Sequence, residues 1–271
     1  MSVPVRVADL GPAAHGVFTT AHGGVSRPPW AAAVPAAATW SGSATGGAAD
    51  GLNLGPHVGD DPSRVRTNRD RVASLVGAPV AWMTQVHGTT VAAVTGRPEP
   101  VESVGEADVL LALPRAGDVV AVGVMVADCV PLLLADAAGR AAAAVHVGRA
   151  GLVADAVGTA VRALAHAGVD PSELSAHLGP SICGSCYEVP ARLQAEVLAA
   201  HPAAEAITHD GTPGLDVAGA VEAALLASGV GRVSRDSACT YEDRRLYSYR
   251  RATHAGEPRT GRFAGIVTLG P

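Results

Sequence analysis

Three residues with metal-binding side chains each lie at the end of a short apolar stretch. They are His87, Cys129 and His146, in segments 85–88, 127–131 and 144–148. Imidazole nitrogen and thiolate sulfur are good ligands for zinc, and three protein ligands leave the fourth tetrahedral position open, as catalytic zinc sites do. The sequence therefore predicts a three-ligand zinc site that is also the catalytic centre, with copper as the alternative metal.

Two of these ligands belong to a predicted β-hairpin. The apolar runs 131–134 and 141–147 flank a turn, and Cys129 and His146 lie near the open end of the two strands. A two-residue turn would place Cys129 directly opposite His146, with Cβ atoms about 4.5–5.5 Å apart. A three-residue loop with a left-handed Gly139 would shift the pairing by one residue, unless a bulge restored the match.

The same residues allow two other chemistries. A Cys129–His146 dyad would be a metal-free hydrolase nucleophile. A mononuclear copper site would add Met83 or Met125 as a weak axial ligand. Multicopper oxidation is disfavoured, because none of the ten histidines forms a His-x-His segment.

Many ordered motifs along most of the chain resemble the bacterial YfiH-type family, whose members are described both as laccase-domain or polyphenol oxidase proteins and as purine nucleoside phosphorylases. The matching segments are 18–20, 23–26, 52–55, 57–62, 68–69, 85–88, 127–131, 178–182, 186–189, 247–251 and 260–262. The resemblance implies zinc bound by His87, Cys129 and His146. It also implies a fold of sandwiched sheets flanked by helices.

The activity that the resemblance implies is the phosphorolysis of adenosine, inosine and methylthioadenosine to free base and pentose 1-phosphate, with deamination of adenosine as a second reaction. A purine nucleoside and phosphate would then be the small-molecule partners. The alternatives are a copper-dependent, laccase-like polyphenol oxidoreductase and a non-enzymatic, peptidoglycan-editing factor. The residues we expect to contact substrate are Asn53, Arg149, Tyr187, Arg250 and Arg251.

The chain departs from the family pattern at two places. Ala21 and His22 stand where the family has an arginine after the Thr-Thr pair. Segment 146–151 reads His-Val-Gly-Arg-Ala-Gly, whereas the family favours His-Ala-Gly-Trp-Arg-Gly. A tryptophan that would cover the substrate is therefore missing, and either Arg149 takes over anion binding or the substrate preference differs.

The element pattern predicts an α+β fold of mixed sheets packed as a sandwich and flanked by helices, in one compact domain over 1–271. Apolar spacing and caps predict helices from Asp61, over 152–167 and after Asp216. The predicted strands are 80–86, 107–113, 119–127, 131–135, 141–147, 175–179, 230–235, 245–250 and 263–269. The uncharged, Ala- and Pro-rich stretch 28–49 is expected to be a flexible loop insert.

Composition limits the possible partners and location. The chain has 271 residues, of which 48% are hydrophobic, and a formal net charge of -5, which gives no basic surface for nucleic acid. No apolar stretch is long enough for a membrane span, and no basic-apolar leader is evident at the N-terminus. We expect a cytoplasmic protein that is a monomer or a weak homodimer.

Cys183 and Cys186 have the spacing of a redox pair or of half a zinc ribbon. No second CxxC pair occurs in the sequence. A local thiol pair is therefore favoured, with Cys239 as a similar structural thiol.

Overall fold

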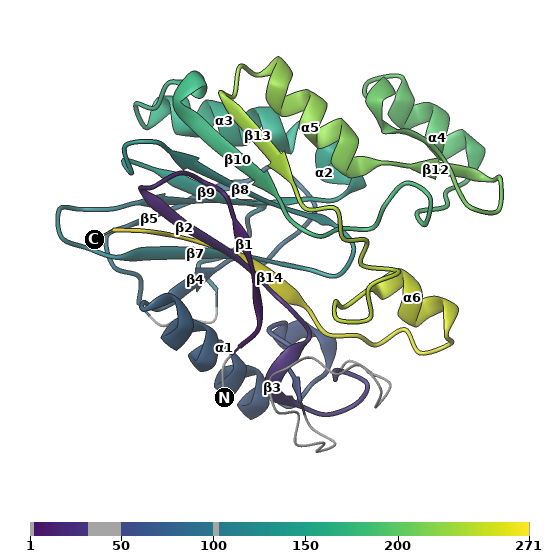
Figure 1. Cartoon of the computed structure of the whole chain (residues 1–271), viewed down its shortest axis with the longest axis horizontal. Helices are drawn as coiled ribbons and strands as arrows, with labels where there is room; N and C mark the ends of the chain where they lie inside the picture. Colours follow the sequence, from purple (N-terminus) through teal and green to yellow (C-terminus); the bar gives the residue numbers. More distant parts are fainter. Residues whose placement is uncertain (1–2, 32–49, 100–102, 271) are drawn as a thin grey trace.

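The computed structural model describes residues 3–31, 50–99 and 103–270 of the chain. Two β-sheets face each other, and helices lie outside both of them (Figure 1). The predicted sandwich of mixed sheets flanked by helices is confirmed. Of the predicted insert 28–49, residues 32–49 lie outside the described residues. Within the described part of the chain, no helix is both long and apolar enough to cross a bilayer.

The first sheet has the strand order β1-β2-β14-β7-β4 and the second has the order β13-β10-β8-β9-β6-β5. In the first sheet the strands are β1 (Val5–Ala8), β2 (Ala14–Thr19), β14 (Phe263–Leu269), β7 (Val120–Val126) and β4 (Val80–Trp82). In the second they are β13 (Arg232–Arg235), β10 (Leu174–Leu178), β8 (Val130–Asp136), β9 (Ala142–Val147), β6 (Val109–Leu113) and β5 (Val91–Thr95). A short pair, β11 (Glu205–Ile207) and β12 (Pro213–Leu215), and strand β3 (His22–Ser26) lie outside these sheets.

The central strands are apolar along their whole length because both of their faces are covered. Successive side chains of a strand point to opposite faces. In β8, Leu133 packs into the core between the sheets, whereas Leu132 and Leu134 pack on the opposite side, against the helices. In β7, Val122 and Val124 face the core between the sheets. Continuous apolar runs in the sequence thus correspond to strands in the interior of a layered structure.

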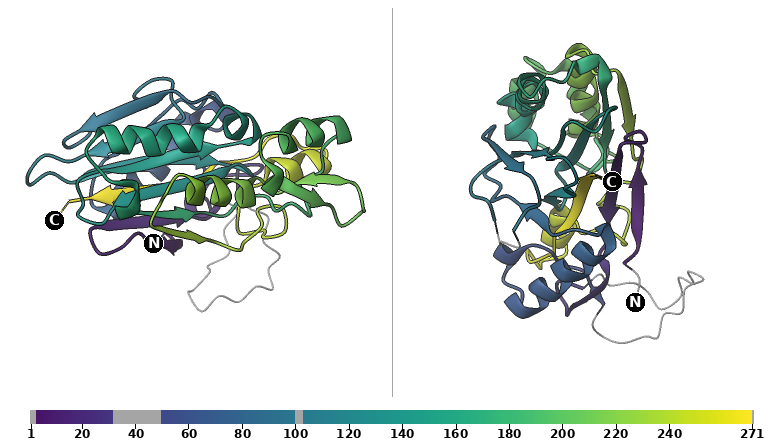
Figure 2. Two further views of the ribbon diagram at one scale, coloured as in Figure 1. Left: turned by 90° about the horizontal axis from the view of Figure 1, so that it is seen from above. Right: turned by 90° about the vertical axis from the view of Figure 1, so that its left-hand side faces the viewer.

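Helices cover the outer faces of both sheets. The helices of the described residues are α1 (Pro62–Val76), α2 (Arg149–Val153), α3 (Ala156–His166), α4 (Ala191–Leu198), α5 (Val217–Ala227) and α6 (Tyr249–His254), of which α6 lies at the end of the strands (Figure 1). Helices α2, α3 and α5 contribute to the core outside the second sheet, and α1 packs against the first sheet through Val72. Figure 2 shows α3 and α5 along one side of the strands and α1 beyond the opposite side.

Two predicted elements need correction. The predicted strand 245–250 is wrong: the chain turns over residues 244–246, and α6 begins at Tyr249. Ser248 caps this helix by accepting a hydrogen bond from Arg251 N, at 3.1 Å. The predicted helix 152–167 is divided into α2 and α3, because Asp155 adopts a left-handed conformation with φ 68° and accepts from Gly158 N as the cap of α3.

Candidate metal centre and cavity

Segments far apart in the sequence bring His87, Cys129 and His146 together. His87 lies in the loop after β4, Cys129 connects β7 to β8, and His146 lies near the end of β9. Their ligand atoms all lie within 4.8 Å of one another. Cys129 Sγ is 3.9 Å from His87 Nε2, and the two imidazole rings meet edge to face with centroids 4.6 Å apart. We call these residues the three-donor site.

The predicted register of the hairpin is wrong, although the ligands still meet. His146 pairs with Pro131, and the register continues so that Gly148, not His146, is level with Cys129. Five residues, 137–141, lie between β8 and β9, and Gly139 among them has the left-handed conformation, at φ 72°. A Cβ atom on Gly148 would lie 3.0 Å from both Cys129 Sγ and His87 Cδ2. The glycine therefore leaves the space in which these side chains approach each other.

Asp108 organises the three-donor site, and the sequence analysis did not identify it. Its fully buried carboxylate accepts hydrogen bonds from the backbone N–H groups of His87, at 3.0 Å, and Gly88, at 2.7 Å. The same carboxylate lies 2.8 Å from Nδ1 of His146, which leaves Nε2 as the ligand atom of that ring. His87 has a positive φ of 61°, a rare conformation for a residue other than glycine, and these hydrogen bonds hold it there.

The charges within the site favour a thiolate beside an imidazolium. Burial alone would raise the pKa of Cys129, but His146 and His87 outweigh it and lower that pKa to about 6. Burial would lower the pKa of His146, but the Cys129 thiolate and Asp108 raise it to about 9. Half-buried Cys129 and nearly fully buried His146 thus stabilise each other's charged forms.

The donor set fits a zinc ion. One thiolate and two imidazoles are the ligand types that zinc takes, and a carboxylate behind a ligating histidine fixes its tautomer in many metal sites. The pKa of Cys129 is already lowered to about 6, which favours the thiolate that metal coordination requires. All three donors border one large cavity, so the side of the site away from Asp108 is accessible to a small molecule.

The cavity has a volume of about 1090 Å³, and most of the charged residues that line it are cationic. Four arginines, Arg69, Arg149, Arg250 and Arg262, line it, and Asp128 is its one acidic lining residue among the described residues. Asp128 accepts hydrogen bonds from Thr240 Oγ1, at 2.6 Å, and from Arg250 N, at 2.7 Å. Its negative charge is therefore already stabilised by groups of the protein. The cavity is thus suited to a molecule that carries negative charge.

Three of the five predicted substrate contacts line this cavity. Arg149 begins α2, directly after Gly148, and the guanidinium of Arg250 lies over the ring of Tyr187, 5.0 Å from its centroid. Burial raises the pKa of Tyr187, and the Cys129 thiolate raises it further, so this phenol keeps its proton.

The other two predicted contacts, Asn53 and Arg251, do not line the cavity. Asn53 is fully buried and accepts from Arg262 N at 2.9 Å, so it positions a residue that does line the cavity. Arg251 donates to the backbone carbonyls of Thr240, Tyr241 and Leu246.

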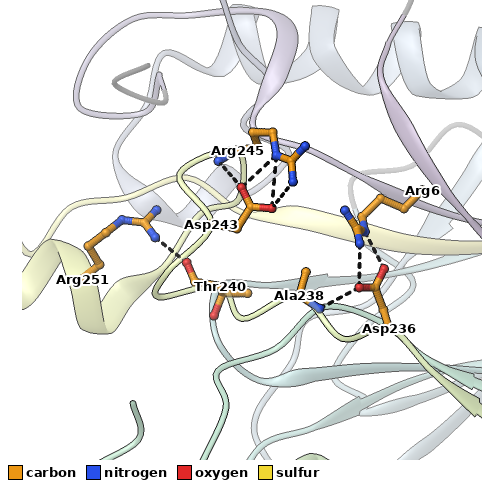
Figure 3. Close-up of polar contacts among 7 residues, drawn as sticks. All are labelled: Arg6, Asp236, Ala238, Thr240, Asp243, Arg245 and Arg251. Atoms are coloured by element: carbon orange, nitrogen blue, oxygen red, sulfur yellow. Dashed lines mark hydrogen bonds and ion pairs between the residues drawn. The ribbon is translucent and has the colours of Figure 1, made fainter. Parts of the chain in front are cut away.

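Segment 236–251, which ends with the cavity residues Tyr249 and Arg250 and with Arg251, is held by side-chain hydrogen bonds (Figure 3). Asp236 accepts from the guanidinium of Arg6 at 2.5 and 2.8 Å, which ties the segment to β1. Asp243 accepts from Arg245 at 2.8 Å, and Arg251 reaches back to the carbonyl of Thr240. Arg251 therefore holds the loop before its own helix α6.

Several cavity residues escaped sequence reasoning. His57 and Arg69 lie in matching family segments, and Arg262 belongs to the matching motif 260–262, so the motifs marked these positions without a role. Gln85 pairs with the backbone of Met125 at 2.7 and 2.9 Å and thereby fixes the loop before His87. For Asp108 the available signal is a carboxylate directly before the apolar run 109–113.

A family model described as multi-copper polyphenol oxidoreductase laccase matches residues 15–270 of the chain. Among curated relatives, a purine nucleoside phosphorylase of Streptomyces coelicolor is 43% identical over 259 residues, covering 94% of this chain and 96% of that protein. The purine nucleoside phosphorylase YfiH of Shigella flexneri is 34% identical, covering 93% of this chain and 92% of that protein.

Solved structures agree with the fold. A Neisseria meningitidis protein of the DUF152 family superposes with a TM-score of 0.78 at 32% identity, covering 98% of this chain and 99% of that chain. The protein YlmD of Geobacillus stearothermophilus superposes with a TM-score of 0.76 at 26% identity, covering 96% of this chain and 93% of that chain.

Proposed function

Because the chain belongs to the YfiH-type laccase-domain family, whose curated relatives are named purine nucleoside phosphorylases, we propose that it is a zinc-dependent purine nucleoside enzyme. Its main reaction would be the phosphorolysis of adenosine, inosine and methylthioadenosine to free base and pentose 1-phosphate. The observation that carries the proposal is a three-donor site that opens into an arginine-lined cavity.

The cavity arginines have a direct use in phosphorolysis. Phosphate must approach C1′ of the sugar, and guanidinium groups bind phosphate oxygens in a two-pronged geometry. Arg149 and Arg250 line the same cavity as the three-donor site and are the groups we assign to phosphate. Holding phosphate and nucleoside together removes much of the entropic cost of their reaction. The ring of Tyr187, backed by Arg250, offers a face for the base or sugar.

Adenosine deamination is the second reaction that we propose for this site. A zinc ion held by His87, Cys129 and His146 would lower the pKa of water, which is the chemistry that attack on the purine C6 requires. Asp108 contributes by holding the His146 ring in one tautomer and the His87 loop in one conformation. Met83 belongs to the core between the sheets and also lines the cavity, so this core supports the cavity at that point.

The test is product analysis with purified protein. Adenosine, inosine and methylthioadenosine are incubated with and without phosphate, and free base, pentose 1-phosphate and ammonia are measured. We expect phosphate-dependent release of base, and loss of this activity in Cys129→Ala. Arg149→Ala should raise the KM for phosphate, whereas Arg192→Ala, a change on exposed α4, should not. Full phosphorolysis by a metal-free chain with all three donors changed to alanine would contradict the proposal.

Copper-dependent oxidation of phenols is the second candidate, because the matching family model is described in those terms. Met83 and Met125 both line the cavity, as an axial ligand would have to. Arg69 donates to Met125 Sδ at 3.5 Å, however, and Met83 packs in the core between the sheets. Oxygen uptake with a phenol by the copper-loaded protein, in the absence of nucleoside turnover, would favour this candidate.

A further inference from the structure

A second group of soft ligands lies beside the cavity, separate from the three-donor site. The sulfur atoms of Cys183, Cys186 and Cys239 all lie within 4.8 Å of one another. The sequence suggested a local pair at 183 and 186, but the fold adds a third thiol from more than fifty residues along the chain. We call these three residues the cysteine cluster. All four cysteines of the chain are described, and none forms a disulfide.

The backbone around the cysteine cluster is arranged as a ligand-bearing turn. Cys186 N and Tyr187 N both donate to the carbonyl of Cys183 at 3.0 Å, which folds the two cysteines toward each other. Cys183 N donates to the sulfur of Cys239 at 3.4 Å. A β-bridge between Ser181 and Cys239 fixes the second segment alongside the first. The three sulfur atoms are therefore placed by the backbone of two segments.

Two further donors lie at the open side of the cluster. Cys186, His209 and Glu242 also have ligand atoms within 4.8 Å of one another. Cys186 Sγ donates to Glu242 Oε1 at 3.6 Å, and His209 Nε2 lies 3.4 Å from the same oxygen. The side chains of His209 and Glu242 are more than half exposed, so they can turn toward a metal without disturbing the core.

We propose that the cysteine cluster is a second, structural zinc site, with Cys183, Cys186 and Cys239 as thiolate ligands and His209 as the fourth ligand. Three cysteines and one histidine form one of the established closed sets for structural zinc. Glu242, which contacts His209, would accept a hydrogen bond from the histidine ring, as carboxylates commonly do behind ligating histidines. Binding would release the three thiol protons to solvent.

The position of the cluster gives the second zinc a role in building the cavity wall. Ile182 and Tyr187, which flank Cys183 and Cys186, both line the cavity. Thr240 follows Cys239 and donates to Asp128, the neighbour of Cys129. Arg251 donates to the carbonyl of Thr240, the residue after Cys239, and so holds that segment in place. A zinc ion here would fasten segments 181–189 and 239–242 together at the edge of the cavity.

Metal analysis tests this proposal independently of any activity. Wild-type protein is compared with a variant that lacks the three-donor site through His87→Ala, Cys129→Ala and His146→Ala, each reconstituted with zinc alone and dialysed. We expect about two zinc ions per wild-type chain and about one in the variant. Cys186→Ser added to that variant should remove the remaining zinc, whereas Ser185→Ala, in the same turn, should retain it.

Two further measurements keep the test decisive if a cysteine variant does not fold. In the wild-type chain, zinc should protect Cys183, Cys186 and Cys239 from iodoacetamide, as read from the modified peptides. Replacement of zinc by cobalt in the variant without the three-donor site should give a strong thiolate-to-cobalt absorption. A folded chain that lacks only the three-donor site, through His87→Ala, Cys129→Ala and His146→Ala, and that holds no zinc overturns the proposal. So does a purified wild-type chain lighter by two hydrogens, which would indicate a disulfide within the cluster.

Discussion

At the scale of single residues, the site depends on the Asp108 carboxylate, which does not line the cavity. Asp108 accepts from two backbone N–H groups of the His87 loop and holds the ring of His146. It therefore couples the conformations of two ligands that lie on different segments. Residues of this kind affect metal affinity strongly, since the ligands lose their alignment without them.

Asp108→Asn should weaken zinc binding at the three-donor site by about 10- to 100-fold. An amide nitrogen replaces one acceptor oxygen and cannot accept from His87 N or Gly88 N. Affinity is measured by competition with a chelator, in a chain that also carries Cys186→Ser. Asp136→Asn is the control, because it also alters a fully buried carboxylate, paired with Arg140. Equal losses of zinc affinity in both variants would refute the role of Asp108.

Zinc affinity at this site should rise with pH. Between the pKa of Cys129, about 6, and that of His146, about 9, the metal-free site holds a thiolate and an imidazolium, so zinc must displace one proton. Affinity should increase about tenfold per pH unit over this range and more steeply below pH 6, where the thiol proton must also leave. Chelator competition at several pH values measures the slope. An affinity independent of pH would contradict the assigned charges.

At the scale of elements, the sites form where strand ends and loops meet. β8 and β9 place Cys129 beside Gly148, and the loop after β4 brings His87 onto the same spot. The approach of the side chains depends on a position without a Cβ atom. Segments 181–189 and 239–242 supply the adjoining wall in the same way, by pairing through the bridge between Ser181 and Cys239.

Gly148→Ala should reduce zinc affinity while the fold persists. The added methyl group would lie 3.0 Å from Cys129 Sγ and His87 Cδ2, so both side chains must move. Gly88→Ala is the matched control in the facing loop, since its Cβ would meet its nearest neighbours at 3.5 and 3.7 Å, an ordinary contact. Zinc content and far-UV circular dichroism measure the two effects. Unchanged zinc affinity in Gly148→Ala would show that the crowding is relieved elsewhere.

At the scale of the whole molecule, the two sheets form the frame that holds the sites. One apolar core lies between the two sheets. A second lies between the second sheet and its helices, and a third lies between the first sheet and α1. Substitutions in the core between the sheets should therefore change stability more than metal binding. The ligands lie at the ends of strands, where local adjustment is possible.

Leu133→Ala should lower the free energy of unfolding by about 2–5 kcal/mol, because it opens a cavity between the sheets. Leu133 is fully buried and faces the first sheet from β8. Val7→Ala, on exposed β1, should change stability by less than about 0.5 kcal/mol. Denaturant unfolding measures both variants, and zinc content should stay unchanged in each. A small effect of Leu133→Ala would mean that the two sheets repack around the gap.

The sequence by itself determined the ligand types and the layered class of the fold. Apolar runs such as 120–126 predict strands covered on both faces, since only such strands can be apolar at every position. The segments that contain His87, Cys129 and His146 indicated a metal centre, because imidazole and thiolate groups at strand ends are suitable metal ligands. Arg149, Tyr187 and Arg250, which the sequence analysis expects to contact substrate, line the cavity, and their contact with substrate stays a prediction.

The tertiary structure decided the register of β8 and β9, the residues that hold the metal-binding side chains in place, and the neighbours of each side chain. The pairing of β8 with β9 decided which residues face each other, and the turn between these strands is also held from outside, since Ala137 N donates to the carbonyl of Glu173. Residues 249–250, predicted to end a strand, instead begin α6, whose N-terminus is capped by Ser248. Asp108 and Cys239 reach their partners only through long-range contacts, and local sequence does not identify those partners because they come from distant segments.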